Sequence, residues 1–146
     1  MKLTVRQRSA EASPGLRACL RVDRRTPSLL PRLRAGDIAV IDHIDLDRAT
    51  AQALVEAHVA AVVNAAPMIS GRYPNLGPLV LAEAGIPLVD SVGSDALARL
   101  RDGAEVRLHE GELFAGDDLL AAGRVVDLEV VRSEMDQARA GMAAQL

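Results

Sequence analysis

The side chains best suited to bind a ligand lie in one loop, between an apolar segment and the start of a helix-like segment. Free backbone N–H groups at a helix start attract anions, and glycines let the backbone approach them closely. Hydroxyl, amide and guanidinium groups add further donors. We therefore predict a phosphate or carboxylate site, with a structural loop whose Arg72 pairs with a carboxylate as the equal alternative. The ligand-binding residues expected from this loop are Ser70, Gly71, Arg72, Tyr73, Asn75 and Gly77.

A second polar cluster follows the apolar segment Ile38–Ile41 and runs from Asp42 to Asp47. Carboxylates and an imidazole in such a cluster can hold a hard cation, but a helix that begins here needs a capping carboxylate. We favour capping and solvent exposure and predict no metal site. Asp90 ends the next strand on the same sheet edge. A ligand bound at the loop is expected to meet Asp42, His43 and Asp90.

Apolar segments alternate with helical patterns through the middle of the chain. Short unbroken apolar strands separated by helices are typical of a parallel sheet covered on both faces. Asp45 or Asp47 can cap the first helix, Pro78 suits the first turn of the second, and Gly85 suits its exit. The expected elements, in order, are the strand Ile38–Ile41, the helix Asp47–Ala57, the strand Ala60–Val63, the helix Pro78–Ala84 and the strand Pro87–Val89.

The flanking segments have different patterns. A strand is expected at Arg17–Val22, and Thr26-Pro27 reads as an N-cap before a short helix over Ser28–Leu33. Ser94 is expected to cap a helix over Asp95–Arg101. Alternation predicts a hairpin of Glu105–His109 and Glu112–Ala115, with a further strand over Leu119–Val126.

The last segment lacks a helix breaker from Asp127 to Gly141 and carries a heptad-like apolar seam. The seam predicts either an interface with another chain or packing on the domain's own sheet. We expect an unstructured segment over residues 1–15, an α/β domain over 16–126, and over 127–146 a helix that leads to a further domain. The seam residues are Leu128, Val131, Met135, Ala138 and Met142.

Length and composition favour a single cytoplasmic domain. The 146 residues can bury a core, and Cys19 is the only cysteine, so no disulfide closes within the chain. The longest apolar stretch, about Ala57–Ala66, is too short to span a membrane. With two aromatic residues in the chain, stacking on nucleic acid bases is disfavoured.

Charge is unevenly distributed. Residues 1–34 carry nine Lys/Arg and two acidic residues, a net charge of +7, whereas residues 35–146 carry a net charge of −10. The arginines from Arg17 to Arg34 could meet an anionic membrane surface. We favour the alternative that this segment lies against the chain's own acidic body.

Enzymatic chemistry has little support in the residue pattern. His58 and His109 lack partners at metal-ligand or proton-transfer spacing, and the sequence has no Ser-His-Asp arrangement, no P-loop and no dinucleotide-binding glycine motif. We therefore expect no catalytic residues, and no cofactor, in this chain.

Several segments of the sequence together carry a specific family resemblance. The segments Val22–Thr26, Arg34–His43, Asn64–Pro67 and Ser70–Pro78 resemble actinobacterial SteA proteins, which are cytokinetic-ring or cell-separation proteins. The likeness continues through Gly85–Asp90 to the terminal helix and covers nearly all of residues 20–146.

The resemblance implies a domain architecture and a partner. Members of the family carry a downstream domain like thiamine pyrophosphokinase, where nucleotide or phosphate is expected to bind, and then a membrane segment. They work with the membrane protein SteB in daughter-cell separation. This chain is expected to correspond to the N-terminal module, and the downstream parts are expected to hold it at the inner face of the membrane at the division septum. Separately from the resemblance, we expect a homo-oligomer such as a homodimer.

A more distant similarity concerns the fold. The order of Gly36–Val40, Ala61–Val63, Glu83–Pro87 and Leu100–Val106 is similar to the swivelling β/β/α domain of phosphoenolpyruvate-utilising enzymes. Those domains carry a phosphorylated histidine in the loop that corresponds to Ala65–Pro78, which has none here. We thus expect an α/β swivelling-like domain with a central parallel sheet, a C-terminal hairpin and a terminal helix.

The preferred hypothesis is a non-catalytic module that binds a partner, a second copy or an anion. The alternative is a ligand-binding or enzymatic domain in which Ser70, Arg72 and the helix start at Gly77 hold a phosphorylated metabolite or a nucleotide. In that alternative the ligand lies beside Asp42, Asp45 and Asp90.

Overall fold

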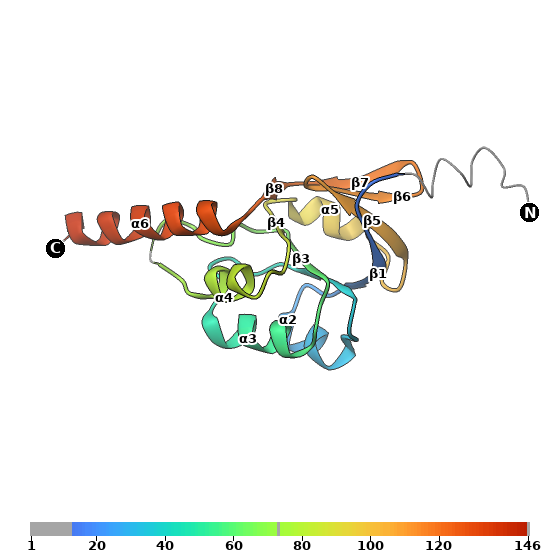
Figure 1. Cartoon of the computed structure of the whole chain (residues 1–146), viewed down its shortest axis with the longest axis horizontal. Coiled ribbons are helices and arrows are strands. Elements are labelled where there is room, and N and C mark those ends of the chain that lie inside the picture. Colours follow the sequence, from blue (N-terminus) through green and yellow to red (C-terminus); the bar gives the residue numbers. More distant parts are fainter. Residues whose placement is uncertain (1–12, 73, 146) are drawn as a thin grey trace, which may run out of the picture.

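A computed structural model describes residues 13–72 and 74–145, and Figure 1 shows their arrangement. The chain is a mixed α/β protein built on an eight-stranded sheet of order β7-β6-β5-β1-β2-β3-β4-β8. The predicted fold class is confirmed: the sheet has a parallel centre, a hairpin follows it, and a helix ends the described chain. The expectation of an unstructured N-terminal segment falls mostly on residues 1–12, which lie outside the described residues.

Four parallel strands form the centre of the sheet. Their apolar side chains are buried on both faces, as expected for a parallel sheet between two layers. The predicted strands are confirmed within a residue at each end. They are β1 (Leu16–Val22), β2 (Ile38–Ile41), β3 (Ala61–Asn64) and β4 (Leu88–Asp90).

The antiparallel part of the sheet begins on β1. The first half of β1 pairs antiparallel with β5 (Glu105–His109), and its second half pairs parallel with β2. The predicted hairpin is confirmed as β5 and β6 (Glu112–Ala115), and β7 (Asp118–Ala122) extends it.

The single strand expected over Leu119–Val126 is wrong. The chain forms two strands here, β7 and then β8 (Arg124–Val125), at opposite edges of the sheet. Gly123 is the one residue between β7 and β8. Because these are the two edge strands, the sheet must curl until its edges lie close together. A Cβ atom at Gly123 would lie 2.4 Å from the carbonyl oxygen of Asp90. The close contact with β4 therefore needs a glycine at this position, and the strand is divided there.

Within residues 13–72 and 74–145, the α-helices that cover the sheet are α2 (Thr26–Leu29), α3 (Arg48–Glu56), α4 (Gly77–Glu83), α5 (Ser94–Arg99) and α6 (Leu128–Gln145). Two predicted caps are wrong, because Thr26 and Ser94 are the first helical residues and the caps are Arg25 and Gly93. The helix expected over Ser28–Leu33 is divided too, since a 3₁₀ turn, η1 (Leu30–Arg32), follows α2 and holds Pro31.

Two apolar clusters fill the space on either side of the central strands. One lies between the parallel strands, the antiparallel strands and α5, and the other packs side chains of the α2–η1 segment, α3, α4 and α6 on the opposite face. Figure 1 shows α3 and α4 on one side of the strands and β5–β7 with α5 on the other. The layer order is thus β/β/α.

The terminal helix packs on its own domain through most of the predicted seam. Val131, Met135 and Ala138 are buried, and α6 contacts α4. The prediction of these three residues as an interface is therefore corrected, because the apolar face of α4 already covers them. Leu128 is partly buried, and Met142 keeps 43% of its surface exposed. Among the helices of residues 13–72 and 74–145, none combines the length and the apolar character needed to cross a bilayer.

Candidate functional site

The carboxyl ends of β2, β3 and β4 meet at one sheet edge, where sequence analysis places a ligand. Asp90 at the end of β4 is fully buried and accepts a hydrogen bond from the backbone N–H of Met68 at 2.8 Å. The loop after β3 therefore does lie beside the end of β4, as predicted. What the side chains do there differs from the prediction.

Asp90 is held by an ion pair rather than left open to a ligand. Arg124 of β8 donates to it through Nε at 3.0 Å and Nη2 at 2.8 Å, and its Nη1 pairs with Glu134 of α6. The hydrogen bond to Asp90 is the main cause that raises the pKa of Arg124 above its ordinary value. Asp90 is thus a structural residue, which corrects its assignment to the ligand site.

Asn64 at the end of β3 is a second structural residue at this edge. Its side chain is fully buried, accepts hydrogen bonds from the N–H groups of His43 and Ala66 at 3.0 Å, and donates to the His43 carbonyl at 2.8 Å. Sequence reasoning did not single it out. An asparagine that ends an apolar strand was the available signal, since a buried amide must find partners.

His43 and Asp42 pair with neighbouring residues and do not converge on a common point. The His43 ring lies 3.2 Å from the hydroxyl of Thr26 and 3.3 Å from a carboxylate oxygen of Asp47. Asp42 pairs with Arg24 at 3.6 Å. In the part of the chain that the structure describes, no three His, Cys, Asp or Glu residues gather as a metal site.

Asp47 caps α3, as one of the two predicted alternatives. Its carboxylate accepts the backbone N–H of Thr50 at 3.0 Å and the Thr50 hydroxyl at 2.7 Å. Partial burial alone would raise the pKa of Asp47, but the hydrogen bonds from Thr50 and the nearby His43 outweigh it. The pKa is therefore lower than the ordinary 3.8.

Several backbone N–H groups of the loop between β3 and α4 donate hydrogen bonds within the protein. Asp45 accepts the backbone N–H and the hydroxyl of Ser70, each at 2.7 Å, and the Ser70 hydroxyl oxygen accepts the N–H of Arg72 at 3.3 Å. The N–H of Gly77 donates to the Leu46 carbonyl at 3.1 Å. These three amides are engaged within the protein and do not form the anion cradle that the sequence suggested.

Gly77 has a packing role instead. A Cβ atom there would lie 2.2 Å from the carbonyl oxygen of Leu46, so only glycine allows α4 to begin against this segment. Gly71 has a φ of 93°, a conformation that favours glycine. The buried side-chain nitrogen of Asn75 has no hydrogen-bond partner among residues 13–72 and 74–145. Tyr73, predicted as a site residue, lies outside the described residues.

An open hollow of about 550 Å³ lies beside this loop; we call it the loop corner. Its lining residues are Ile44, Asp45, Pro67, Ile69, Ser70 and Arg72. Ile44 keeps 56% of its surface exposed, and the guanidinium of exposed Arg72 has no partner in the described chain. A Cβ atom at Gly141 of α6 would lie 3.9 Å from the Gly71 carbonyl oxygen, so the terminal helix borders the same loop.

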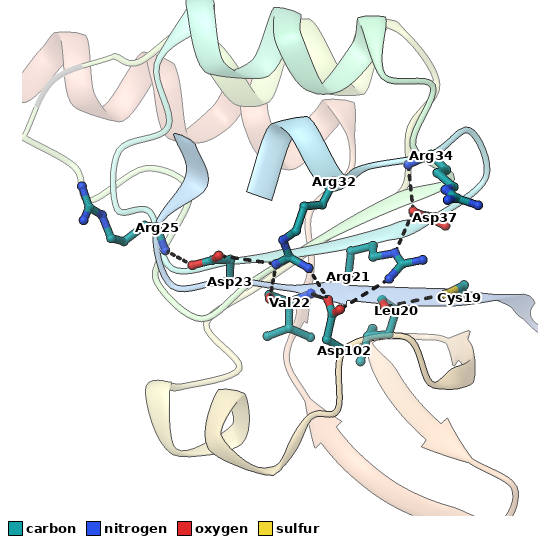
Figure 2. A network of polar contacts seen from close by, with 10 residues as sticks. All are labelled: Cys19, Leu20, Arg21, Val22, Asp23, Arg25, Arg32, Arg34, Asp37 and Asp102. Carbon is teal, nitrogen blue, oxygen red and sulfur yellow. Dashed lines mark hydrogen bonds and ion pairs between the residues drawn. The ribbon is translucent and has the colours of Figure 1, made fainter. Parts of the chain in front are cut away.

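Three of the six arginines from Arg17 to Arg34, namely Arg21, Arg24 and Arg32, pair with the chain's own carboxylates, which agrees in part with the favoured alternative. Figure 2 shows Arg32 donating to Asp102 at 3.0 Å and to the Val22 carbonyl at 2.9 Å, while Arg21 reaches Asp102 and Asp37 at 3.4 Å. Burial opposes ionisation of Asp102, but the Val22 N–H and the two arginines outweigh it and lower its pKa.

No protein-family model and no curated protein matches the chain. A functional assignment therefore rests on the geometry above and on the resemblance noted in the sequence. Of the predicted ligand residues, the geometry leaves Arg72 with an exposed, unpaired functional group in the described chain. Asp42, His43, Ser70, Gly77 and Asp90 have internal roles.

Proposed function

We propose that this chain is a non-catalytic binding module of a SteA-like cell-separation protein and that it docks a partner protein at the loop corner. The observation that carries the proposal is the contrast within the corner. Its backbone donors and Asp45 are engaged internally, whereas Arg72 and Ile44 face solvent beside one hollow. Such a surface suits a protein segment better than a phosphate group.

The chemistry of the corner indicates what the partner presents. An unpaired guanidinium beside exposed aliphatic surface fits a segment that carries a carboxylate next to an apolar side chain. Asp45 lines the same hollow and keeps its negative charge, but Ser70 occupies both of its oxygens, so Arg72 is the charged group left free to contact a partner. The engaged Asp45 and the free Arg72 thus leave the corner with a cationic contact and an apolar one.

The SteB-like membrane protein is the partner that the resemblance implies, at the inner face of the membrane at the division septum. Self-association, expected from the sequence independently of the resemblance, is a separate proposal for the same chain. Because Val131, Met135 and Ala138 are buried, a homodimer formed through α6 would use other residues such as Met142, which is 43% exposed.

The test measures binding of the chain to the purified SteB-like protein in detergent. Arg72→Glu and Ile44→Ser should each weaken binding at least tenfold, equivalent to about 1.4 kcal/mol. Arg99→Glu is the matched control, because Arg99 is exposed on α5 and its substitution changes the net charge of the chain by the same amount as Arg72→Glu. Unchanged binding by both corner variants would show that the partner does not dock at the loop corner. If the unmodified chain does not bind the SteB-like protein, that protein is not its partner.

A second candidate function, binding of a phosphorylated metabolite or nucleotide, is favoured by the free guanidinium of Arg72 alone. A thermal-shift screen separates it from the first. A ligand at a hundred times its dissociation constant should stabilise the fold by about 2.7 kcal/mol. A shift that Arg72→Glu abolishes would favour this candidate, whereas no shift across the panel would exclude it.

A further inference from the structure

A row of four side chains crosses the antiparallel strands far from the loop corner. Arg17 of β1 lies directly opposite Arg107 of β5, Arg107 lies opposite Phe114 of β6, and Phe114 lies opposite Leu119 of β7. Side chains at directly opposed positions project from the same face of a sheet. The row therefore places two guanidinium groups, an aromatic ring and an aliphatic side chain next to one another.

The second guanidinium is held in place. Arg107 lies over the Phe114 ring, 4.3 Å from its centroid, and donates to the Pro14 carbonyl at 2.8 Å. A cation over an aromatic face is attracted to it, and the carbonyl fixes the direction of one N–H group. Arg107 is thus ordered before any ligand arrives, so binding through it would lose little side-chain entropy.

The first guanidinium has no carboxylate partner. Arg17 is exposed, and within residues 13–72 and 74–145 it makes no ion pair. Like charges directly opposite each other across two strands are destabilising. Arg32 and Arg124, by contrast, are each paired with carboxylates. Neither Arg17 nor Arg107 has a carboxylate partner among residues 13–72 and 74–145, so an anion between the two would relieve the repulsion.

We propose that a small oxyanion, a phosphate or carboxylate group, binds between Arg17 and Arg107 on the outer face of the antiparallel sheet. The two side chains line a hollow of about 190 Å³ together with Phe114 and Glu105. Guanidinium groups hold such oxyanions through paired N–H donors, which makes arginine the preferred residue for this recognition. The site lies on a different surface from the loop corner and does not depend on the proposed function.

Substitutions of Glu105 and of Arg17 should change anion binding in opposite directions, which tests the proposed site. Glu105 lies opposite Cys19, two pairs along from Arg17 and therefore on the same face, and lines the same hollow. A carboxylate there competes with an incoming anion. Glu105→Gln should therefore strengthen anion binding, whereas Arg17→Gln should weaken it. A general effect of net charge alone would not depend on whether the substituted residue lines this hollow.

The experiment titrates the whole chain with inorganic phosphate and, separately, with acetate, at constant ionic strength set by chloride. Two-dimensional NMR follows the amide signals of β1 and β5. We expect saturable shifts that Arg17→Gln weakens at least tenfold and Glu105→Gln strengthens severalfold, with Arg99→Gln as a control of equal charge change. Arg107→Gln should also abolish binding, but Arg17→Gln is the primary variant because it leaves the Phe114 contact intact.

The outcomes are distinguishable. Tighter binding of phosphate than of acetate supports a phosphate ligand, and the reverse supports a carboxylate such as that of an acidic peptide. Absence of saturation with both anions, or saturation that Arg17→Gln leaves unchanged, overturns the proposal. Binding of the SteB-like partner should be unaffected by Arg17→Gln, so failure here and failure of the loop-corner proposal would be seen separately.

Discussion

Two networks of arginines and carboxylates stabilise this chain, and they differ in burial rather than in chemistry. In one, Arg124 bridges Asp90, which is fully buried, and Glu134. In the other, shown in Figure 2, Arg32 and Arg21 share Asp102, whose side chain is 40% exposed. The first joins β8, β4 and α6, and the second joins β1 and η1 to the turn after α5.

The difference decides what each network can contribute. Removing Arg124 would leave the carboxylate of Asp90 as a buried, uncompensated charge, which is strongly destabilising, whereas pairs between exposed groups are screened by water and contribute little. Burial also decides which charged side chains remain free to contact a ligand or a partner. Asp90 has no capacity for a ligand because Arg124 and Met68 occupy it, while Arg17 and Arg72, which are exposed, have guanidinium groups without ion-pair partners in the described chain.

The largest effect is expected from Asp90→Ala. The substitution leaves the buried N–H of Met68 without its acceptor, while Arg124, whose side chain is 44% exposed, keeps Glu134, and it should reduce the free energy of unfolding by about 2 kcal/mol. Urea unfolding followed by circular dichroism measures it. Asp90→Asn, which keeps the shape and one acceptor, should lose less. An Asp90→Ala variant as stable as the unmodified chain would contradict the structural role and return Asp90 to the ligand site.

A smaller effect is expected where the same network reaches α6. Glu134 pairs with Arg124 and keeps 22% of its side chain exposed. Glu134→Gln should reduce the free energy of unfolding by about 1.5 kcal/mol, since hydrogen bonds between charged groups are stronger than neutral ones. Asp136→Asn on the same helix is the control, because Asp136 is 77% exposed and should change stability by less than about 0.5 kcal/mol. Equal losses in the two variants would contradict the comparison.

The strands could be predicted from sequence because an unbroken apolar run between turn residues has few alternatives. Ile38–Ile41 and the Glu105–Ala115 hairpin are confirmed to the residue. The division of the last strand at Gly123 could not be predicted, since it follows from contact with β4, which lies far away in the sequence. Thr26 was misplaced for a similar reason, because its hydroxyl meets His43 rather than the start of its own helix.

The candidate site was less predictable than the fold. The sequence places Ser70, Gly77 and Asp90 near one sheet edge, and the structure agrees, but their hydrogen-bonding groups are used within the protein. A polar residue at a strand end can bind a ligand or stabilise the fold. Only the number of its hydrogen-bond partners within the protein distinguishes these two roles. The Arg17–Arg107 pair was missed because strand register, not spacing along the chain, brings the two side chains together.

A third prediction concerns the cap of α3, which is more exposed than Asp90. Asp47→Ala should reduce the free energy of unfolding by about 1 kcal/mol at neutral pH. The pKa of Asp47 is lowered in the folded protein, so its contribution is present above the ordinary carboxyl pKa and is lost as pH falls through the lower native value. Unfolding measured at pH 7 and at acid pH should show the two chains converging only in acid. A constant difference would contradict this account.

The smallest effect belongs to the exposed network. Asp102→Asn should reduce the free energy of unfolding by about 0.5 kcal/mol at pH 7, because water already screens its pairs with Arg32 and Arg21. The pKa of Asp102 is lowered, so this difference should also be lost as pH falls through its lower native value. Salt separates the two networks most sharply. Raising sodium chloride to about 1 M shortens the screening length to about 3 Å and should remove most of the Asp102→Asn effect. The loss caused by Asp90→Ala should survive, since the carboxylate of Asp90 is not in contact with solvent. If both losses shrink together, burial does not separate the networks, and Asp90 is more accessible to ions than its position at the end of β4 indicates.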